Sequence, residues 1–141
     1  MITKCDKKTS DAFHSLMAAS QAVISPIDLF VKMGKLKPKQ VEDWRFGRIA
    51  FLEAAVEGSL PEIGRILRKL AELGANAGLK QSRTVYMRWG KGSKGQLRFS
   101  KTGDINVEAA WSTHYMNAYL VDRGKRTITD ITQNDPAHEP A

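Results

Sequence analysis

Apolar residues recur at intervals of three and four along most of the chain, and this spacing predicts a succession of amphipathic helices. Most of them are bounded by a capping residue before the first turn or by a glycine after the last, as helices in folded proteins usually are. The most clearly amphipathic one keeps leucine and isoleucine on one face and basic residues on the other. The predicted helices span residues 9–23, 26–33, 38–56, 60–73 and 106–121.

Two local features refine these helices. Gly47 lies inside the third helix, where glycine costs roughly 1 kcal/mol relative to alanine, so it marks close packing, a kink or a break. Ser59 and Glu62 form a capping box before the fourth helix, because each side chain can bond to an exposed backbone N–H. The start of the fourth helix is therefore the most sharply predicted boundary.

The spacing changes from helical to alternating in the second half of the chain. Residues 84–89 and 96–101 each alternate between apolar and polar positions, which is typical of half-buried strands. The glycine-rich basic segment 90–95 lies between them, so the pattern predicts a β-hairpin with this segment at its tip. The apolar face is expected to carry Val85, Met87 and Trp89, and the polar face Thr84, Tyr86 and Arg88.

The order of these elements predicts one mostly helical α+β domain, with four or five helices and one two-stranded antiparallel β-hairpin. A helix followed by a basic hairpin also suggests a winged-helix-like arrangement, in which a helix enters the major groove of DNA and the hairpin contacts the backbone. The domain is expected over residues 9–124, after a flexible N-terminus of residues 1–8 and before a polar, largely disordered tail of residues 125–141.

The composition narrows the class of protein. Its 141 residues, 42% of them hydrophobic, are enough for one domain with a real core. No apolar run approaches the roughly 20 residues needed to cross a bilayer, and the N-terminus has no secretory pattern. Cys5 is the only cysteine and cannot form an internal disulfide. We therefore expect a cytoplasmic protein without a membrane partner.

The net charge of +7 is concentrated in one part of the chain. Residues 61–101 hold ten basic and two acidic residues, whereas the rest of the chain is close to neutral. A local positive field attracts polyanions such as nucleic acid, although basic residues on a surface often do no more than interact with solvent. The ten basic residues are Arg65, Arg68, Lys69, Lys80, Arg83, Arg88, Lys91, Lys94, Arg98 and Lys101.

The glycine-rich segment 90–95 does not carry a known phosphate-binding motif. Its glycines match the spacing G-x-G-x-x-G, but a strand follows them where a dinucleotide-binding motif requires a helix. A P-loop fails because Gln96 and Leu97 stand where lysine and serine or threonine are required. A protein-kinase loop fails because the chain lacks the other kinase elements. What remains is a flexible turn, or a generic anion contact through backbone N–H groups and lysines.

Nucleic-acid binding without catalysis is the leading functional hypothesis. An aromatic residue flanked by arginines on a strand surface can stack a base while the cations hold phosphate. The main alternative is a protein–protein interaction module or inhibitor that binds an acidic partner through the same surface. The expected nucleic-acid contacts are Arg65, Arg68, Lys69, Arg83, Tyr86, Arg88, Lys91, Lys94, Arg98 and Lys101, with Trp89 as a further stacking candidate.

A third alternative is a small metal-independent RNase-like enzyme that uses His114 as a general acid or base. His114 lies on the apolar stripe of its predicted helix, however, which favours a hydrogen-bonded core histidine.

The three histidines and one cysteine have no metal-ligand spacing. We therefore expect neither a metal nor a cofactor.

Two stretches of the chain resemble a pattern found in small uncharacterised bacterial proteins. The first is Trp44-Arg45-Phe46-Gly47-Arg48 with Leu52-Glu53, and the second is Leu97-Arg98-Phe99-Ser100-Lys101-Thr102-Gly103 followed by Thr113-His114-Tyr115. The resemblance covers about residues 25–115. It implies a bacterial, cytoplasmic setting and carries no catalytic residues over.

Overall fold

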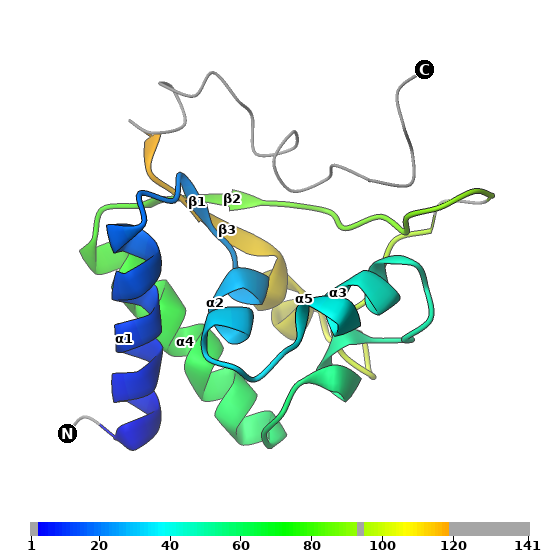
Figure 1. Ribbon diagram of the computed structural model, residues 1–141, viewed down its shortest axis with the longest axis horizontal. Coiled ribbons are helices and arrows are strands. Elements are labelled where there is room, and N and C mark those ends of the chain that lie inside the picture. Colours follow the sequence, from blue (N-terminus) through cyan, green and yellow to red (C-terminus); the bar gives the residue numbers. More distant parts are fainter. Residues whose placement is uncertain (1–2, 93–94, 119–141) are drawn as a thin grey trace.

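The structure is a computed structural model that describes residues 3–92 and 95–118. These residues form a helical domain with a small antiparallel sheet (Figure 1). This combination of helices with a small sheet confirms the predicted α+β, mostly helical fold class. Its α-helices are α1 (Lys4–Ala18), α2 (Pro26–Lys32), α3 (Pro38–Arg45), α4 (Leu60–Asn76) and α5 (Ile105–Ser112). A 3₁₀ helix, η1 (Leu52–Ala55), and the strands β1 (Val23–Ile24), β2 (Lys80–Arg83) and β3 (Thr113–Met116) complete the described elements.

The sheet has the order β1-β3-β2, with all neighbours antiparallel. Its central strand corrects the sequence prediction, because residues 113–116 were expected to continue the last helix. Tyr115 is paired with Ile24 on one side and Gln81 on the other, so β3 bonds to two strands at once. These long-range pairings outweigh the helical spacing of the apolar residues, so α5 ends at Ser112.

The predicted hairpin of residues 84–101 is only partly formed. Its two segments share one isolated bridge, Met87 with Gln96, next to which the Leu97 N–H donates to the Tyr86 carbonyl at 2.8 Å. The faces are reversed at the start of the first segment, whereas Arg88 is exposed as predicted. Tyr86 is only 6% exposed, whereas Val85 is 53% exposed. The core takes the aromatic ring because burying it removes more apolar surface from water.

The first helix begins earlier than the sequence predicts. The Thr3 hydroxyl accepts a hydrogen bond from the Asp6 N–H at 3.1 Å, and this cap starts α1 at Lys4. Residues 4–8 therefore belong to the folded domain, and the expectation of a flexible segment 1–8 is corrected for them. The predicted tail, residues 125–141, lies outside the described residues.

The predicted third helix breaks near Gly47. Helix α3 ends at Arg45, and Gly47 has a φ angle of +80°, in the left-handed region that favours glycine. A Cβ atom at this position would lie 2.7 Å from Nε of Arg88, so the chain also approaches another segment closely here. Of the three outcomes left open for Gly47, both the break and close packing are found.

Helix α4 matches its prediction best and packs against α1 and the sheet (Figure 1). The Ser59 hydroxyl caps it by accepting from the Glu62 N–H at 3.2 Å. The Glu62 carboxylate departs from the predicted capping box and pairs instead with Lys35 at 3.1 Å. Of the six positions predicted to face inward, Ile63, Ile66, Leu67 and Leu70 are buried and Leu73 is partly buried, whereas Leu60 is 68% exposed. Gly74 is buried as well.

Gly74 provides a test of this packing. A Cβ atom there would lie 2.6 Å from Cδ1 of Tyr115 in β3, so we expect Gly74→Ala to lower the free energy of unfolding by about 1–3 kcal/mol. Gly64→Ala in the same helix is the matched control, because its Cβ meets only the flexible end of Arg68 at 3.2 Å. It is expected to be neutral or to stabilise by up to about 1 kcal/mol. Urea denaturation measures both, and equal effects would contradict this account.

Candidate nucleic-acid interface

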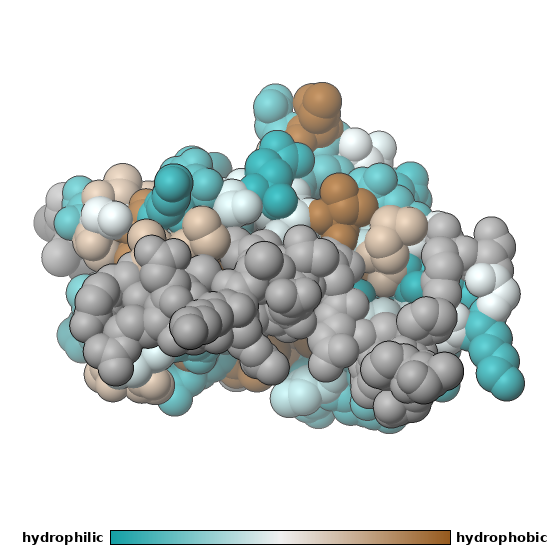
Figure 2. Space-filling model, turned by 90° about the horizontal axis from the view of Figure 1, so that it is seen from above, coloured by the Kyte–Doolittle hydropathy of each residue, from teal (hydrophilic) through white to brown (hydrophobic). Residues whose placement is uncertain are grey.

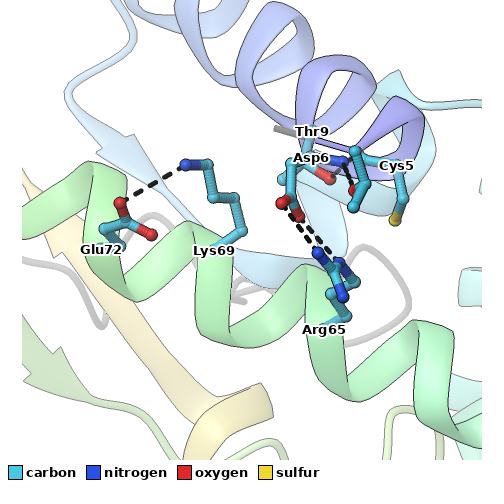
Figure 3. A network of polar contacts seen from close by, with 7 residues as sticks. Cys5, Asp6, Thr9, Arg65, Lys69 and Glu72 are labelled. Atoms are coloured by element: carbon cyan, nitrogen blue, oxygen red, sulfur yellow. Dashed lines mark hydrogen bonds and ion pairs between the residues drawn. The ribbon is translucent and has the colours of Figure 1, made fainter. Parts of the chain in front are cut away.

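The basic row predicted on α4 is largely engaged within the domain. Arg65 holds Asp6 of α1 in a two-pronged contact, with Nε to Oδ1 at 3.0 Å and Nη2 to Oδ2 at 3.1 Å (Figure 3). Hydrogen bonds from the Arg65 guanidinium hold the pKa of Asp6 below its ordinary value. This pair ties α1 to α4 and occupies the arginine that the sequence assigned to phosphate.

The other two basic residues of α4 differ from each other. Lys69 Nζ lies 3.4 Å from Oε1 of Glu72, and its side chain is only 18% exposed (Figure 3). Arg68 is exposed, and within the described residues it forms no ion pair. Of the predicted row on α4, Arg68 alone therefore presents an uncompensated charge.

Tyr86, predicted to stack a base, lies in the core instead. Its hydroxyl is 2.6 Å from Nε2 of His114, and the Thr84 hydroxyl is 3.2 Å from Nδ1 of the same ring. Burial raises the pKa of the Tyr86 phenol. A neutral imidazole has one donor and one acceptor nitrogen, so it can bond to both hydroxyls at once. Tyr86 is thus a structural residue, and the stacking role is corrected.

His114 is fully buried on β3, with 0% of its surface exposed. Burial lowers its pKa to about 4, so the ring is neutral at physiological pH. An RNase-like mechanism needs an acid or base that the substrate can reach, and His114 does not offer one in this fold. The expected alternative, a hydrogen-bonded core histidine, describes its position.

The buried ring should make stability depend on pH. Between about pH 6.5 and pH 4 the unfolded chain binds a proton at His114 that the folded chain does not, so the free energy of unfolding falls as pH falls. The full effect is about 3 kcal/mol. We expect His114→Gln to flatten the profile in this window. Asp28 and Glu53 have raised pKa values and act in the opposite direction in both proteins, so the difference between the two profiles isolates His114.

That comparison is made by urea denaturation at several pH values from 7 to 4. Parallel profiles for the wild type and His114→Gln would show that the ring does not remain neutral in the folded state.

Trp89 is also held within the domain. The Arg45 guanidinium lies 4.5 Å from the centre of the Trp89 ring and 5.1 Å from that of Tyr86, while Arg45 itself is only 2% exposed. The rings of Phe46 and Trp89 are close to perpendicular, with their centres 5.7 Å apart. These cation–π and aromatic contacts assign Trp89 and Arg45 to packing.

The remaining basic residues lie in a part of the chain that has no acidic residue. Residues 73–103 hold seven lysines and arginines and no aspartate or glutamate. We call residues 80–101 the basic arm. Six of its basic residues fall in the described part of the chain, where all are exposed and none forms an ion pair. They are Lys80, Arg83, Arg88, Lys91, Arg98 and Lys101; Lys94 lies outside the described residues.

The basic arm is attached to the core along its length. The Trp44 indole N–H donates to the Arg98 carbonyl at 2.8 Å. The Glu108 carboxylate accepts from the N–H groups of Phe99 and Ser100, at 3.0 Å and 2.8 Å. The Trp89 N–H donates to the Arg45 carbonyl at 2.6 Å. These bonds fix the backbone of the arm, so its basic side chains project from a defined base.

Two arginines of the arm also make side-chain contacts. Arg83 donates through Nε to the Ser112 hydroxyl at 3.2 Å, and Arg88 donates through Nε to the Phe46 carbonyl at 3.3 Å. Both contacts use neutral acceptors, so the positive charges stay uncompensated.

Figure 2 shows one face of the molecule coloured by hydropathy. Among the residues coloured there, hydrophilic side chains surround separate hydrophobic ones.

The sequence alone missed two groups that shape this surface. Asp6 compensates Arg65, and Glu108 holds the chain at residues 99 and 100. Asp6 and Glu108 each lie in the first turn of a helix, a position that can be recognised in the sequence. That position indicates only a favourable interaction with the helix dipole and does not identify a partner. Their partners lie 59 and 8–9 residues away and follow from the fold.

Within the described ranges, no three histidine, cysteine, aspartate or glutamate side chains come together as a metal site, and no helix is long and apolar enough to cross a membrane. No protein-family model matches this chain, and neither a curated protein nor a solved structure is similar enough to count as a match.

Proposed function

We propose that this protein binds nucleic acid through the basic arm, with Arg68 of α4 as an additional contact. The observation that carries the proposal is the contrast between two groups of basic residues. Arg65 and Lys69 are compensated by carboxylates, whereas the six described basic residues of the arm are exposed and have no acidic partner among the described residues. A field that the protein does not neutralise itself is available to an external polyanion.

The shape of the arm supports a backbone contact. Figure 1 shows the chain continuing from β2 as an extended segment to a tip far from α1. An extended, basic segment can follow a phosphate backbone, and each phosphate that it neutralises releases counterions. Tyr86 and Trp89 are engaged in packing, so this binding relies on phosphate contacts and not on aromatic stacking.

The order of the elements and the expected cellular setting are both consistent with nucleic-acid binding, although the proposal does not depend on them. Helix α4 is followed by β2 and the basic arm, which keeps the order of helix and basic extended segment on which the winged-helix comparison rests. As part of the same proposal, the protein works in the cytoplasm, where nucleic acids are abundant.

Fluorescence anisotropy with labelled single-stranded DNA, duplex DNA and RNA, each at a low and a higher salt concentration, tests the proposal. We expect binding to at least one of the three at low salt and a marked loss at higher salt. Absence of binding to all three at low salt would overturn it and would favour the alternative of an acidic protein partner.

A further inference from the structure

A cavity of about 720 Å³ lies between α4, α5 and the sheet. Its volume falls within the range of small-molecule sites in proteins. The wall from α4 presents Leu67 and Ala71, and the wall from α5 presents Val107 and Ala110. Tyr115 of β3 lines it as well. Aliphatic side chains and small alanines therefore form much of the lining.

Charged groups also line this cavity. Arg68 reaches back along α4 toward Gly64, since its Nη1 lies 3.2 Å from where a Gly64 Cβ would be. Ala71 lies farther along α4, about 10 Å from Gly64 at 1.5 Å per residue. Lys101, just after the bonds that fix Ser100, and Glu53 on η1 complete the charged groups of the lining.

The charges favour one kind of head group. Arg68 and Lys101 contribute two positive charges, and Glu53 contributes one carboxylate, of which Oε2 already accepts from the Trp111 indole at 2.9 Å. The cavity therefore carries an excess of one positive charge, which matches a ligand with one negative charge. The hydroxyl of Thr102 and the amide of Asn106 add uncharged hydrogen-bonding groups to the lining.

We propose that the cavity binds an amphipathic monoanion, namely an aliphatic carboxylate of the fatty-acid class. Its hydrocarbon chain would lie along Leu67, Ala71, Val107 and Ala110, and its carboxylate would meet Arg68 and Lys101. Apolar walls give such a ligand most of its binding free energy, and the two cations orient it. The inference does not depend on nucleic-acid binding.

Isothermal titration calorimetry with dodecanoate, below its micelle concentration, tests this inference on the full chain. Dodecanol and dodecyltrimethylammonium have the same hydrocarbon chain with a neutral and a cationic head. We expect dodecanoate to bind at about 1:1, dodecanol about tenfold or more weakly, and the cation more weakly still. Absence of dodecanoate binding, or equal binding of all three, would overturn the proposal.

Variants locate the binding. Ala71→Trp places a large ring in the cavity and is expected to abolish dodecanoate binding, whereas Ala75→Trp, an exposed position of α4 outside the lining, is the matched control. Arg68→Gln together with Lys101→Gln keeps the walls intact and should weaken dodecanoate about tenfold or more while leaving dodecanol unchanged. Equal binding by the two tryptophan variants, both shown to be folded by circular dichroism, would place the ligand elsewhere and contradict the inference.

The two tryptophan variants separate this inference from the proposed function. Ala71→Trp should leave nucleic-acid affinity unchanged, because Ala71 is not part of the basic arm. Loss of dodecanoate binding with retained nucleic-acid binding supports both proposals, and failure of either measurement in the wild type overturns only its own proposal.

Discussion

Replacing Trp44 by alanine is expected to lower the free energy of unfolding by about 3–5 kcal/mol. Trp44 is 0% exposed, and its ring lies 4.9 Å from Phe99 and 5.6 Å from Tyr86, measured between ring centres. Its indole N–H also donates to the Arg98 carbonyl. The substitution removes a tryptophan ring from this cluster and leaves that carbonyl with only the Leu52 N–H, at 3.3 Å, as a donor. A loss of this size is a large share of the 5–15 kcal/mol that typically stabilises a domain.

Trp44→Phe divides the loss into two parts. The phenyl ring keeps most of the packing but cannot donate a hydrogen bond, so we expect a smaller loss of about 1–3 kcal/mol. Guanidinium denaturation, followed by circular dichroism, measures both variants. A loss below about 1 kcal/mol for Trp44→Ala would show that the aromatic cluster does not hold the basic arm against the core.

Replacing both Arg88 and Lys91 by glutamine is expected to weaken nucleic-acid binding about tenfold or more at low salt. Both side chains are exposed, and neither has a carboxylate partner within the described ranges. The double variant Arg65→Gln with Lys69→Gln is the matched control, because it removes the same formal charge. Those two residues already contact Asp6 and Glu72, so their loss should change affinity much less.

Anisotropy titrations at one low salt concentration compare the two double variants. If the α4 variant loses as much affinity as the arm variant, then net charge alone determines binding and the basic arm has no special part in it. Thermal melts of both proteins confirm that each is folded, which matters for the Arg65 variant because it removes the ion pair between Arg65 of α4 and Asp6 of α1.

Helix α4 could be predicted from sequence because several local signals agree there. Ser59 caps it, Pro61 suits its first turn, and leucines and isoleucines follow a helical spacing. The helix extends only three residues beyond the predicted end, to Asn76. Where capping, composition and spacing all indicate the same element, long-range contacts have little to change.

Strand β3 could not be predicted in the same way. Val107, Ala110, Trp111 and His114 are spaced as on one helix face, yet His114 belongs to a strand. The partners of that strand lie 30 to 36 residues earlier on β2 and 91 to 93 residues earlier on β1. Spacing along the chain carries no information about such partners. Pairing on both edges stabilises β3 more than one further turn of α5 would.

The candidate site was predictable in composition but not in detail. The concentration of charge in residues 61–101 is visible in the sequence, and most of those residues are exposed. Which of them keep an uncompensated charge depends on α1, because Asp6 reaches Arg65 only after the two helices pack. The burial of Tyr86 likewise depends on His114 arriving beside it on β3.

The salt dependence of binding tests the central claim most directly. If the basic arm neutralises phosphates, the logarithm of the association constant should fall linearly with the logarithm of salt concentration, with a slope of about −4 or steeper for five or six contacts. The Arg88→Gln, Lys91→Gln protein should give a slope shallower by about 2. A slope near zero in the wild type, or the same slope in both proteins, would contradict the claim.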